Sequence, residues 1–207
     1  MDTPETIATR LAAQIAEVQV SGPRRLIAIA GPPASGKSTL AANIVEELQA
    51  MGQGAGLLAM DGFHLDNAVL EARGLRQRKG APETFDLAGF HSLLDRLRTG
   101  GEVIGPQFDR ARDLVIGSSV VFAEADQTIV VEGNYLLLDR PGWRDLHGLW
   151  DYSAFLNVAR EDLHRRLIAR WVEHGFSEAE AREKAGRNDL PNADLVCAAR
   201  LRADAVI

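Results

Sequence analysis

The stretch RLIAIAGPPASGKSTLAANI, residues 25–44, joins an apolar run, a loop of small residues and an amphipathic run. The apolar run before Gly31 is continuous and short, as in a strand that is buried on both faces. After the loop, Leu40, Ile44 and Leu48 form one apolar stripe, which predicts a helix ending near Gly52. The loop itself matches G-x-x-x-x-G-K-[ST], and its strand and helix neighbours are the context that a phosphate-binding P-loop requires.

The residue types of this loop suit close contact with phosphate. Small residues let backbone N–H groups approach phosphate oxygens, and the following helix adds its unpaired N–H groups and the positive end of its dipole. We expect Lys37 to reach the β- and γ-phosphates and the hydroxyl of Ser38 to ligate Mg²⁺. A plain strand-to-helix turn is the weaker alternative, because motif and flanks agree. The predicted ATP-binding residues are Gly31, Pro32, Pro33, Ala34, Ser35, Gly36, Lys37, Ser38 and Thr39.

The rest of the chain alternates between short apolar runs and helical patterns. Ser177 and Glu180 have the spacing of a capping box, and Asp86 suits a helix N-cap. This alternation predicts an α/β fold with a mainly parallel sheet flanked by helices, in a single domain over 1–207. The predicted strands are 25–31, 54–62, 127–133, 151–158 and a short one within 203–207, the predicted helices include 86–100 and 160–175, and the β-rich 107–126 predicts a hairpin.

Two acidic residues end predicted strands. Glu132 follows a run of β-branched residues, where it either reaches the metal through water or faces solvent as an ordinary strand-end acid. Asp61 ends the strand after the P-loop helix, at the edge of the sheet where open α/β folds bind ligands. It either accepts a proton from an attacking hydroxyl or ligates the metal, and we favour the proton acceptor.

Composition excludes several classes of function. The chain has 207 residues and a net charge of −6, which argues against general nucleic-acid binding. The only cysteine is Cys197, so no internal disulfide is expected and a reducing, cytoplasmic setting is predicted. The first residues are acidic and amphipathic, unlike a signal peptide, and no apolar run is long enough to predict membrane insertion.

Several motifs together carry a family resemblance: the P-loop, MDGFH (60–64), KGAPETFD (79–86), FDR (108–110) and VVEGNYLLL (130–138). On these, the chain resembles the uridine kinase, phosphoribulokinase and bacterial-type pantothenate kinase group of P-loop kinases. It is most similar to the small proteins described as fructose transport system kinases. The resemblance implies a P-loop NTPase fold, transfer of phosphate from ATP to a hydroxyl, Asp61 as catalytic aspartate and Glu132 as metal-associated acid.

The resemblance also implies an arginine-bearing helical lid at about 160–190. Arg166 and Arg170 are four residues apart and share a helix face, so both are candidates to contact the transferring phosphoryl group. The alternative is a solvated basic face paired with neighbouring acids. In GRNDLPNADLV (186–196), Arg187 and Asn192 either line the adenine end of the site or cap and turn the chain.

We expect the molecule that accepts the phosphate to be a small hydroxylated metabolite, and a sugar such as fructose is the first candidate. Uridine or cytidine and pantothenate are the alternatives, and a partner-driven NTPase is the alternative of another class. The substrate-side segment covers about 62–126, and its predicted substrate contacts are His64, Lys79, Glu83, Asp109 and Arg110. His64 has no His or Cys at a spacing that suggests a metal site. The oligomeric state stays open between a monomer and a homodimer.

Overall fold

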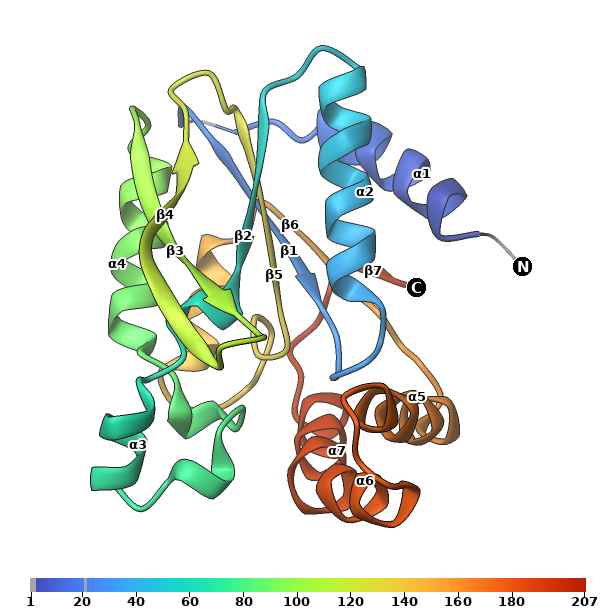
Figure 1. Cartoon of the computed structure of the whole chain (residues 1–207). Coiled ribbons are helices and arrows are strands. Elements are labelled where there is room, and N and C mark those ends of the chain that lie inside the picture. Colours follow the sequence, from blue (N-terminus) through green and yellow to red (C-terminus); the bar gives the residue numbers. More distant parts are fainter. Residues whose placement is uncertain (1–2, 21) are drawn as a thin grey trace.

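The computed structural model describes residues 3–20 and 22–207. Its centre is a five-stranded sheet in the order β2-β5-β1-β6-β7, and every neighbouring pair in it is parallel (Figure 1). This confirms the predicted α/β fold with a mainly parallel sheet. The strands are β1 (Arg25–Ala30), β2 (Ala55–Ala59), β5 (Thr128–Gly133), β6 (Tyr152–Phe155) and β7 (Ala205–Val206).

Strand β1 shows why the strands of the central sheet are continuous apolar runs in the sequence. Its side chains alternate between two cores: Leu26, Ala28 and Ala30 pack on one face, and Ile27 and Ile29 on the other. Helices cover both faces, so the five residues after Arg25 are all buried, and only Arg25 at the start of the strand is partly exposed. The first core contains α4 (Leu87–Arg98), and the second contains α1 (Pro4–Ala16) and α2 (Lys37–Ala50).

Two predicted helix signals are confirmed, and they have the expected geometry. The side chain of Asp86 accepts a hydrogen bond from the N–H of Gly89 at the start of α4. Ser177 and Glu180 form the reciprocal capping box at the start of α6 (Glu178–Lys184). After α2, Gly52 has a φ of 77°, a left-handed conformation that favours glycine just past a helix end.

The predicted hairpin is confirmed, and it begins and ends four residues before the 107–126 stretch. Strands β3 (Val103–Asp109) and β4 (Leu114–Phe122) pair antiparallel, with an irregularity between Gly105 and Gln107. This two-stranded sheet lies beside the central sheet on the side of α4 (Figure 1).

The predicted strand 54–62 is shorter than expected. Strand β2 ends at Ala59, and a 3₁₀ turn, η1 (Met60–Phe63), follows and carries Asp61. The turn packs tightly on the hairpin, since a Cβ on Gly62 would lie 2.7 Å from the carbonyl oxygen of Pro106. Asp61 therefore stands just beyond the carboxyl end of β2 rather than inside the strand.

Two helical groups lie at the carboxyl end of the sheet. Helix α3 (Asn67–Ala72) lies on one side with the short turns η2 (Arg76–Arg78) and η3 (Pro82–Thr84). Helices α5 (Arg160–Glu173), α6 and α7 (Leu190–Ala198) gather on the other side (Figure 1). A π-helical turn, η5 (Ala185–Asp189), joins α6 to α7, so the 186–196 stretch is helical and does not turn the chain away. The remaining element is η4 (Trp143–Leu149).

Within the described residues, no helix combines the length and the apolar character that a membrane crossing needs.

Candidate active site

The loop between β1 and α2 has the backbone shape of a phosphate cradle. Gly36 caps α2 with a left-handed φ of 95°, and it offers no side chain to the first N–H groups of the helix. These groups are consequently directed out of the helix end, where an anion would bind. Backbone approaches closely at Gly31, where an added Cβ would lie 2.8 Å from Oγ of Ser35 and 3.3 Å from the carbonyl oxygen of Leu156.

Lys37, Ser38 and Glu132 form a polar cluster at this loop. The hydroxyl of Ser38 donates to Oε1 of Glu132 at 3.0 Å, which joins the start of α2 to the end of β5. Burial lowers the pKa of Lys37, and the charges of Glu132 and Asp61 oppose that shift. Burial likewise raises the pKa of Glu132, and the charge of Lys37 opposes it. The two opposite charges thus stabilise each other in a site that disfavours either one alone.

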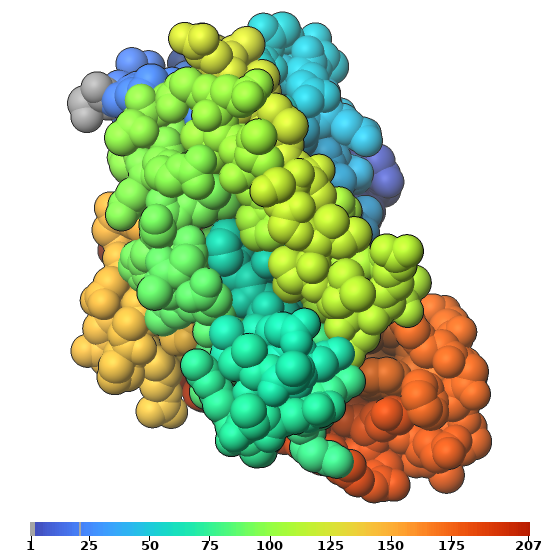
Figure 2. All heavy atoms as spheres, turned by 60° about the vertical axis from the view of Figure 1, so that its left-hand side comes forward, coloured from blue at the N-terminus to red at the C-terminus, as the bar shows by residue number. Residues whose placement is uncertain are grey.

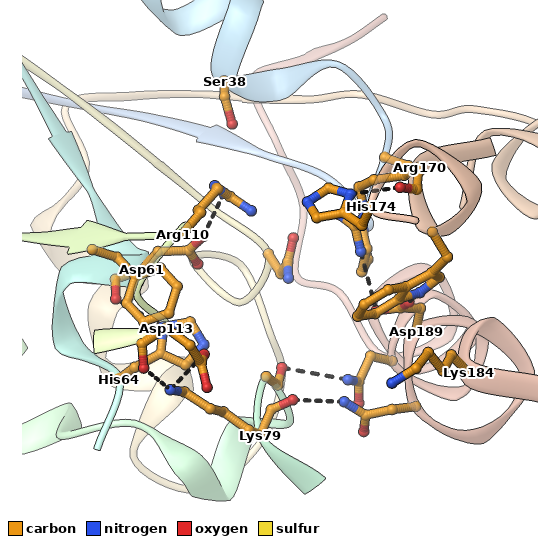
Figure 3. A pocket seen from close by; sticks show the side chains of 18 of the residues that line it. Ser38, Asp61, His64, Lys79, Arg110, Asp113, Arg170, His174, Lys184 and Asp189 are labelled. Carbon is orange, nitrogen blue, oxygen red and sulfur yellow. Dashed lines mark hydrogen bonds and ion pairs between the residues drawn. The ribbon is translucent and has the colours of Figure 1, made fainter. Parts of the chain in front are cut away.

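A cavity of about 1100 Å³ opens from the loop. Figure 3 shows its two walls: Asp61, His64, Lys79, Arg110 and Asp113 on one side, and Arg170, His174, Lys184 and Asp189 on the other. The first wall comes from η1, η2 and the hairpin, and the second from α5, α6 and η5. We name these the hairpin wall and the helical wall. Ser38 lies between them at the end of the cavity that the P-loop closes.

Asp61 faces the cavity in an ion pair. Nη2 of Arg110 donates to its Oδ2 at 2.7 Å, and the side chain of Asp61 is 21% exposed while that of Arg110 is 61% exposed. The arginine is therefore the more exposed partner of this ion pair. Because it lines the same cavity as Lys37, Asp61 is placed to interact with a group brought to a bound phosphate.

His64 is held in one tautomer. Its Nδ1 lies 2.8 Å from the carbonyl oxygen of Asp61, which can only accept, so Nδ1 carries the proton and Nε2 is a hydrogen-bond acceptor. The ring contacts those of Phe85 and Phe108 with tilted planes, at centroid distances of 4.2 and 4.7 Å. Burial lowers the pKa of His64, partly offset by the charge of Asp61, which favours this neutral form.

Lys79 lines the cavity, and its contact with substrate stays a prediction. Its Nζ contacts Oδ1 of Asn67, the carbonyl oxygen of Asp113 and Oδ1 of Asp113, each at 2.8 Å. An ammonium group has three donors, so these contacts engage all of them. The other carboxylate oxygen of Asp113 pairs with Arg76 at 2.9 Å. Lys79 and Asp113 therefore tie the segment after α3 to the tip of the hairpin, and Asp113 adopts a left-handed φ of 55° in that tip.

Seven predicted site residues do not line this cavity, as far as the described residues show: Gly31, Pro32, Ser35 and Glu132 at the P-loop, and Glu83, Asp109 and Arg166 elsewhere. Glu83 pairs with Arg78 at 3.2 Å, and Asp109 pairs with Arg112 at 3.7 Å. Nη1 of Arg166 donates to the carbonyl oxygens of Ala34 and Ser35 at 3.3 and 3.4 Å, so it docks α5 on the P-loop. Their direct roles in substrate or phosphoryl contact stay predictions.

Arg187 and Asn192 both line the cavity, and both contact the hairpin wall. Arg187 donates to Oε1 of Gln77 at 3.0 Å, and Asn192, which is buried, donates to the carbonyl oxygen of Gly80 at 3.3 Å. The hydroxyl of Tyr135 donates to that same oxygen at 2.6 Å. The two walls are thus joined below the cavity, and in Figure 2 the segment after α3 and the C-terminal helices meet there. Contact of Arg187 and Asn192 with adenine stays a prediction.

Sequence reasoning did not single out several lining residues. Asp113 lies outside the quoted family motifs and Asp189 lies inside the quoted 186–196 stretch, but no pattern reveals which basic residue each meets. Phe85 and Phe108 lie inside quoted motifs, so their place beside His64 had a signal in the sequence. Asn134 follows Glu132 closely, and its Oδ1 is buried without a hydrogen-bond partner among the described residues.

Comparison with known proteins agrees with this geometry. The family described as Phosphoribulokinase / Uridine kinase matches residues 26–206. The chain is 36% identical over 203 residues to "Uncharacterized protein YggC" of Escherichia coli K12, covering 93% of this chain and 81% of that protein. It is 34% identical over 186 residues to "Putative uridine kinase C227.14" of Schizosaccharomyces pombe, covering 84% and 78%.

One solved structure is similar over the full length. It is titled as that of a "putative fructose transport system kinase" from Silicibacter sp. TM1040, and it superposes with a TM-score of 0.92 at 45% identity, covering 100% of both chains.

Proposed function

The chain belongs to the phosphoribulokinase/uridine kinase family of small-molecule kinases, and we propose that it moves the γ-phosphate of ATP to a hydroxyl of a sugar, with fructose as the first candidate. One observation carries the proposal. Lys37 and Ser38 of the P-loop line the same cavity as Asp61, so phosphate-binding groups and a carboxylate face one volume (Figure 3). A triphosphate and a hydroxylated acceptor can meet there.

The proposed step is an in-line displacement at the γ-phosphorus. The acceptor oxygen forms a bond to phosphorus, the bond to the β–γ bridging oxygen breaks, and ADP leaves with that oxygen. Asp61 takes the proton of the acceptor hydroxyl once its carboxylate turns from Arg110 to the substrate. Positioning and charge stabilisation supply most of the rate in such reactions, and Lys37 and Arg170 are the cations that we assign to the phosphoryl group.

The residues at the P-loop fit a magnesium ion. Ser38 supplies a hydroxyl, and Glu132 supplies a buried carboxylate whose hydrogen bond to Ser38 brings both oxygens to one place. Oxygen ligands of this kind are the ones that Mg²⁺ prefers. We assign Ser38 as a ligand and Glu132 as the acid that reaches the ion, which when bound would neutralise phosphate charge. Within the described residues, no cluster of three His, Cys, Asp or Glu suggests a metal site of another kind.

The hairpin wall favours a neutral, polyhydroxylated acceptor. Nε2 of His64 offers an acceptor for a hydroxyl proton, and Asp113 offers carboxylate oxygens beside Arg76. Sugar hydroxyls both donate and accept, so alternating charged partners suit them. The rings of Phe85 and Phe108 add apolar surface for the carbon-bound face of a sugar. The neighbour from Silicibacter named for fructose transport adds weight to fructose.

Two alternative acceptors stay open within the same activity. The relative from S. pombe is named as a uridine kinase, and the aromatic surface beside His64 also suits a nucleobase of uridine or cytidine. Pantothenate offers hydroxyls and a carboxylate, and the wall holds Arg76 and Arg110 for an acid group. A partner-driven NTPase would hydrolyse ATP without any of these acceptors. For the cellular setting we keep a reducing, cytoplasmic location, on the ground of the single unpaired Cys197.

The first test measures ATP consumption with identification of the product. The panel contains fructose, other hexoses and pentoses, uridine, cytidine and pantothenate. We expect one neutral sugar to be phosphorylated, and Asp61→Asn to lower kcat by about 10²- to 10⁴-fold, the range for loss of a general base. ATP affinity should be retained, because the P-loop is untouched. Asp95→Asn, an exposed acid on α4, is the matched control and should behave as wild type.

The outcomes of this test distinguish the candidate functions. Phosphorylation of uridine or pantothenate in place of sugars would replace the acceptor and keep the chemistry. Slow hydrolysis that no acceptor stimulates, unchanged by Asp61→Asn, would reject the proposal in favour of a partner-driven NTPase.

A further inference from the structure

Asp189 holds two consecutive residues of the helical wall. It ends the π-helical turn between α6 and α7, and its side chain is only 14% exposed. Oδ2 accepts the indole N–H of Trp171 at 2.7 Å, and Oδ1 pairs with Nη2 of Arg170 at 3.3 Å. A π turn is rare and occurs frequently at functional sites. One carboxylate thus receives a neutral and a charged donor from the same turn of α5.

Helix α5 is fixed against the P-loop by the arginine one turn earlier. Arg166 donates to the carbonyl oxygens of Ala34 and Ser35, and residues four apart lie on the same helix face. Arg170 consequently lies on the face that is turned toward the phosphate cradle, and it lines the cavity. Its guanidinium also lies over the ring of Trp171, at 5.8 Å from the centroid.

The turn that carries Asp189 is anchored from the opposite wall. The amide of its neighbour Asn188 donates to the carbonyl oxygen of Lys79 at 2.7 Å, and Asn192, one turn later, donates to that of Gly80. Lys79 is itself clamped to the hairpin tip. The carboxylate of Asp189 therefore has a fixed position relative to both walls, which a surface ion pair would lack.

We infer that Asp189 is a positioning residue that aims the guanidinium of Arg170 at the γ-phosphate of bound ATP. The inference rests on the proposed function in one respect, namely that the P-loop binds ATP. The ion pair leaves the other N–H groups of the guanidinium for phosphate oxygens, because a guanidinium has five donors in a rigid plane. A purely structural role, holding Trp171 in the helical wall, is the competing explanation.

Asp189→Asn separates the two roles. The amide oxygen of asparagine still accepts from the indole of Trp171, while the charge that pairs with Arg170 is removed. Arg170→Ala removes the guanidinium itself, and the double variant tests whether the two residues act together.

The measurement is the ratio of dissociation constants for ADP and a non-hydrolysable β,γ-imido analogue of ATP, by titration calorimetry. We expect Asp189→Asn to lower the preference for the triphosphate by about five- to tenfold, since charged hydrogen bonds to phosphate are the strong ones. Arg170→Ala should lower it equally, and the double variant no further. Melting temperature and the fluorescence of Trp171, identified by difference from Trp171→Phe, should stay at wild-type values in Asp189→Asn.

An unchanged preference in Asp189→Asn would overturn the inference, as would an effect that simply adds to that of Arg170→Ala. The readout uses no acceptor, so its failure is distinct from failure of the proposed function. If no panel acceptor is phosphorylated but the preference falls, the inference stands and the sugar kinase proposal does not. If an acceptor is phosphorylated and the preference is unchanged, the reverse holds.

Discussion

Among single side chains, Lys37 and Glu132 illustrate how the P-loop is charged before any ligand binds. Burial lowers the pKa of the amine and raises the pKa of the carboxyl, and each charge opposes the shift of the other. Truncating either partner would remove the largest opposing charge from the other, and only Asp61 would then favour the charge of Lys37, or Ser38 and Arg110 that of Glu132. The pair therefore links phosphate binding at α2 to the acid at the end of β5.

His64 predicts how acceptor binding depends on pH. Burial lowers its pKa below the ordinary 6.5, with Asp61 opposing and Lys79 and Arg110 reinforcing the shift. As the pH falls through that lowered pKa, Nε2 gains a proton and can no longer accept from an acceptor hydroxyl. We expect the acceptor KM to rise several-fold at acid pH while the KM for ATP changes little, measured from pH 5 to 8.

His64→Gln tests this assignment, because glutamine keeps a hydrogen-bond acceptor and does not titrate. The variant should show a flat acceptor KM over the same range, and His91→Gln on α4 should keep the wild-type profile. A rise in KM that persists in His64→Gln would contradict the role of His64. The stability of the fold also decreases at acid pH. The unfolded chain binds the proton of His64 at a higher pH than the folded chain does, so the free energy of unfolding falls as the pH drops below 6.5.

Among the secondary-structure elements, η1 is the one whose placement decides the chemistry. It is wedged between two strands: a Cβ on Gly62 would lie 2.7 Å from the carbonyl oxygen of Pro106 in β3, and one on Gly133 would lie 2.6 Å from Cβ of Met60. Both neighbours are atoms that cannot rotate away. The position of Asp61 is thus set by close backbone packing on both sides.

Gly62→Ala should therefore displace η1 and with it Asp61. We expect kcat to fall at least about tenfold, since small misplacements of a reacting group have large effects on rate. The dissociation constant for ATP should change less than twofold. Gly148→Ala is the control, because a Cβ there meets nothing within 4 Å. The rates should be measured well below the melting temperatures of both variants. An unchanged kcat in Gly62→Ala would refute this account of η1.

At the scale of the whole chain, the side chain of Arg24 connects several segments through hydrogen bonds at the amino end of the sheet. It is 1% exposed and donates to four backbone carbonyl oxygens, those of Leu97, Gly101, Ala123 and Asp126. Leu97 is in the last turn of α4, Gly101 lies in the loop from α4 to β3, and Ala123 and Asp126 lie in the loop from β4 to β5. The buried side chain of Arg24 therefore connects the start of β1 to two segments that are far along the chain.

Arg24→Leu should lower the free energy of unfolding by about 3 kcal/mol, because four carbonyl oxygens, one of them buried, lose a charged donor. ATP affinity should stay within twofold, since Arg24 precedes β1 and the P-loop follows it. Urea unfolding measures the first quantity and calorimetry the second. Exposed Arg96→Leu is the control and should lie within about 0.5 kcal/mol of wild type. A loss for Arg24→Leu as small as that of the control would contradict the prediction.

Local patterns predicted the elements well because their causes are local. The P-loop, the caps at Asp86 and Ser177, and the apolar strand β1 each depend on residues within a few positions of one another. The shortened β2 was missed because its end depends on Gly62 meeting Pro106, which is 44 residues away in the sequence. A contact at that separation leaves no periodic signal.

Alternation and motif in the sequence directly encode the parallel sheet and the phosphate loop, together with the acid that follows β2 and the acid near the end of β5. Only the tertiary structure decided what the other polar residues meet. Lys79 is engaged by Asn67 and Asp113, Glu83 pairs with Arg78, and Asp189 holds Arg170. The physical reason is that a charged side chain is assigned by its partner in space, and partners that are brought together by the fold have no fixed spacing along the chain.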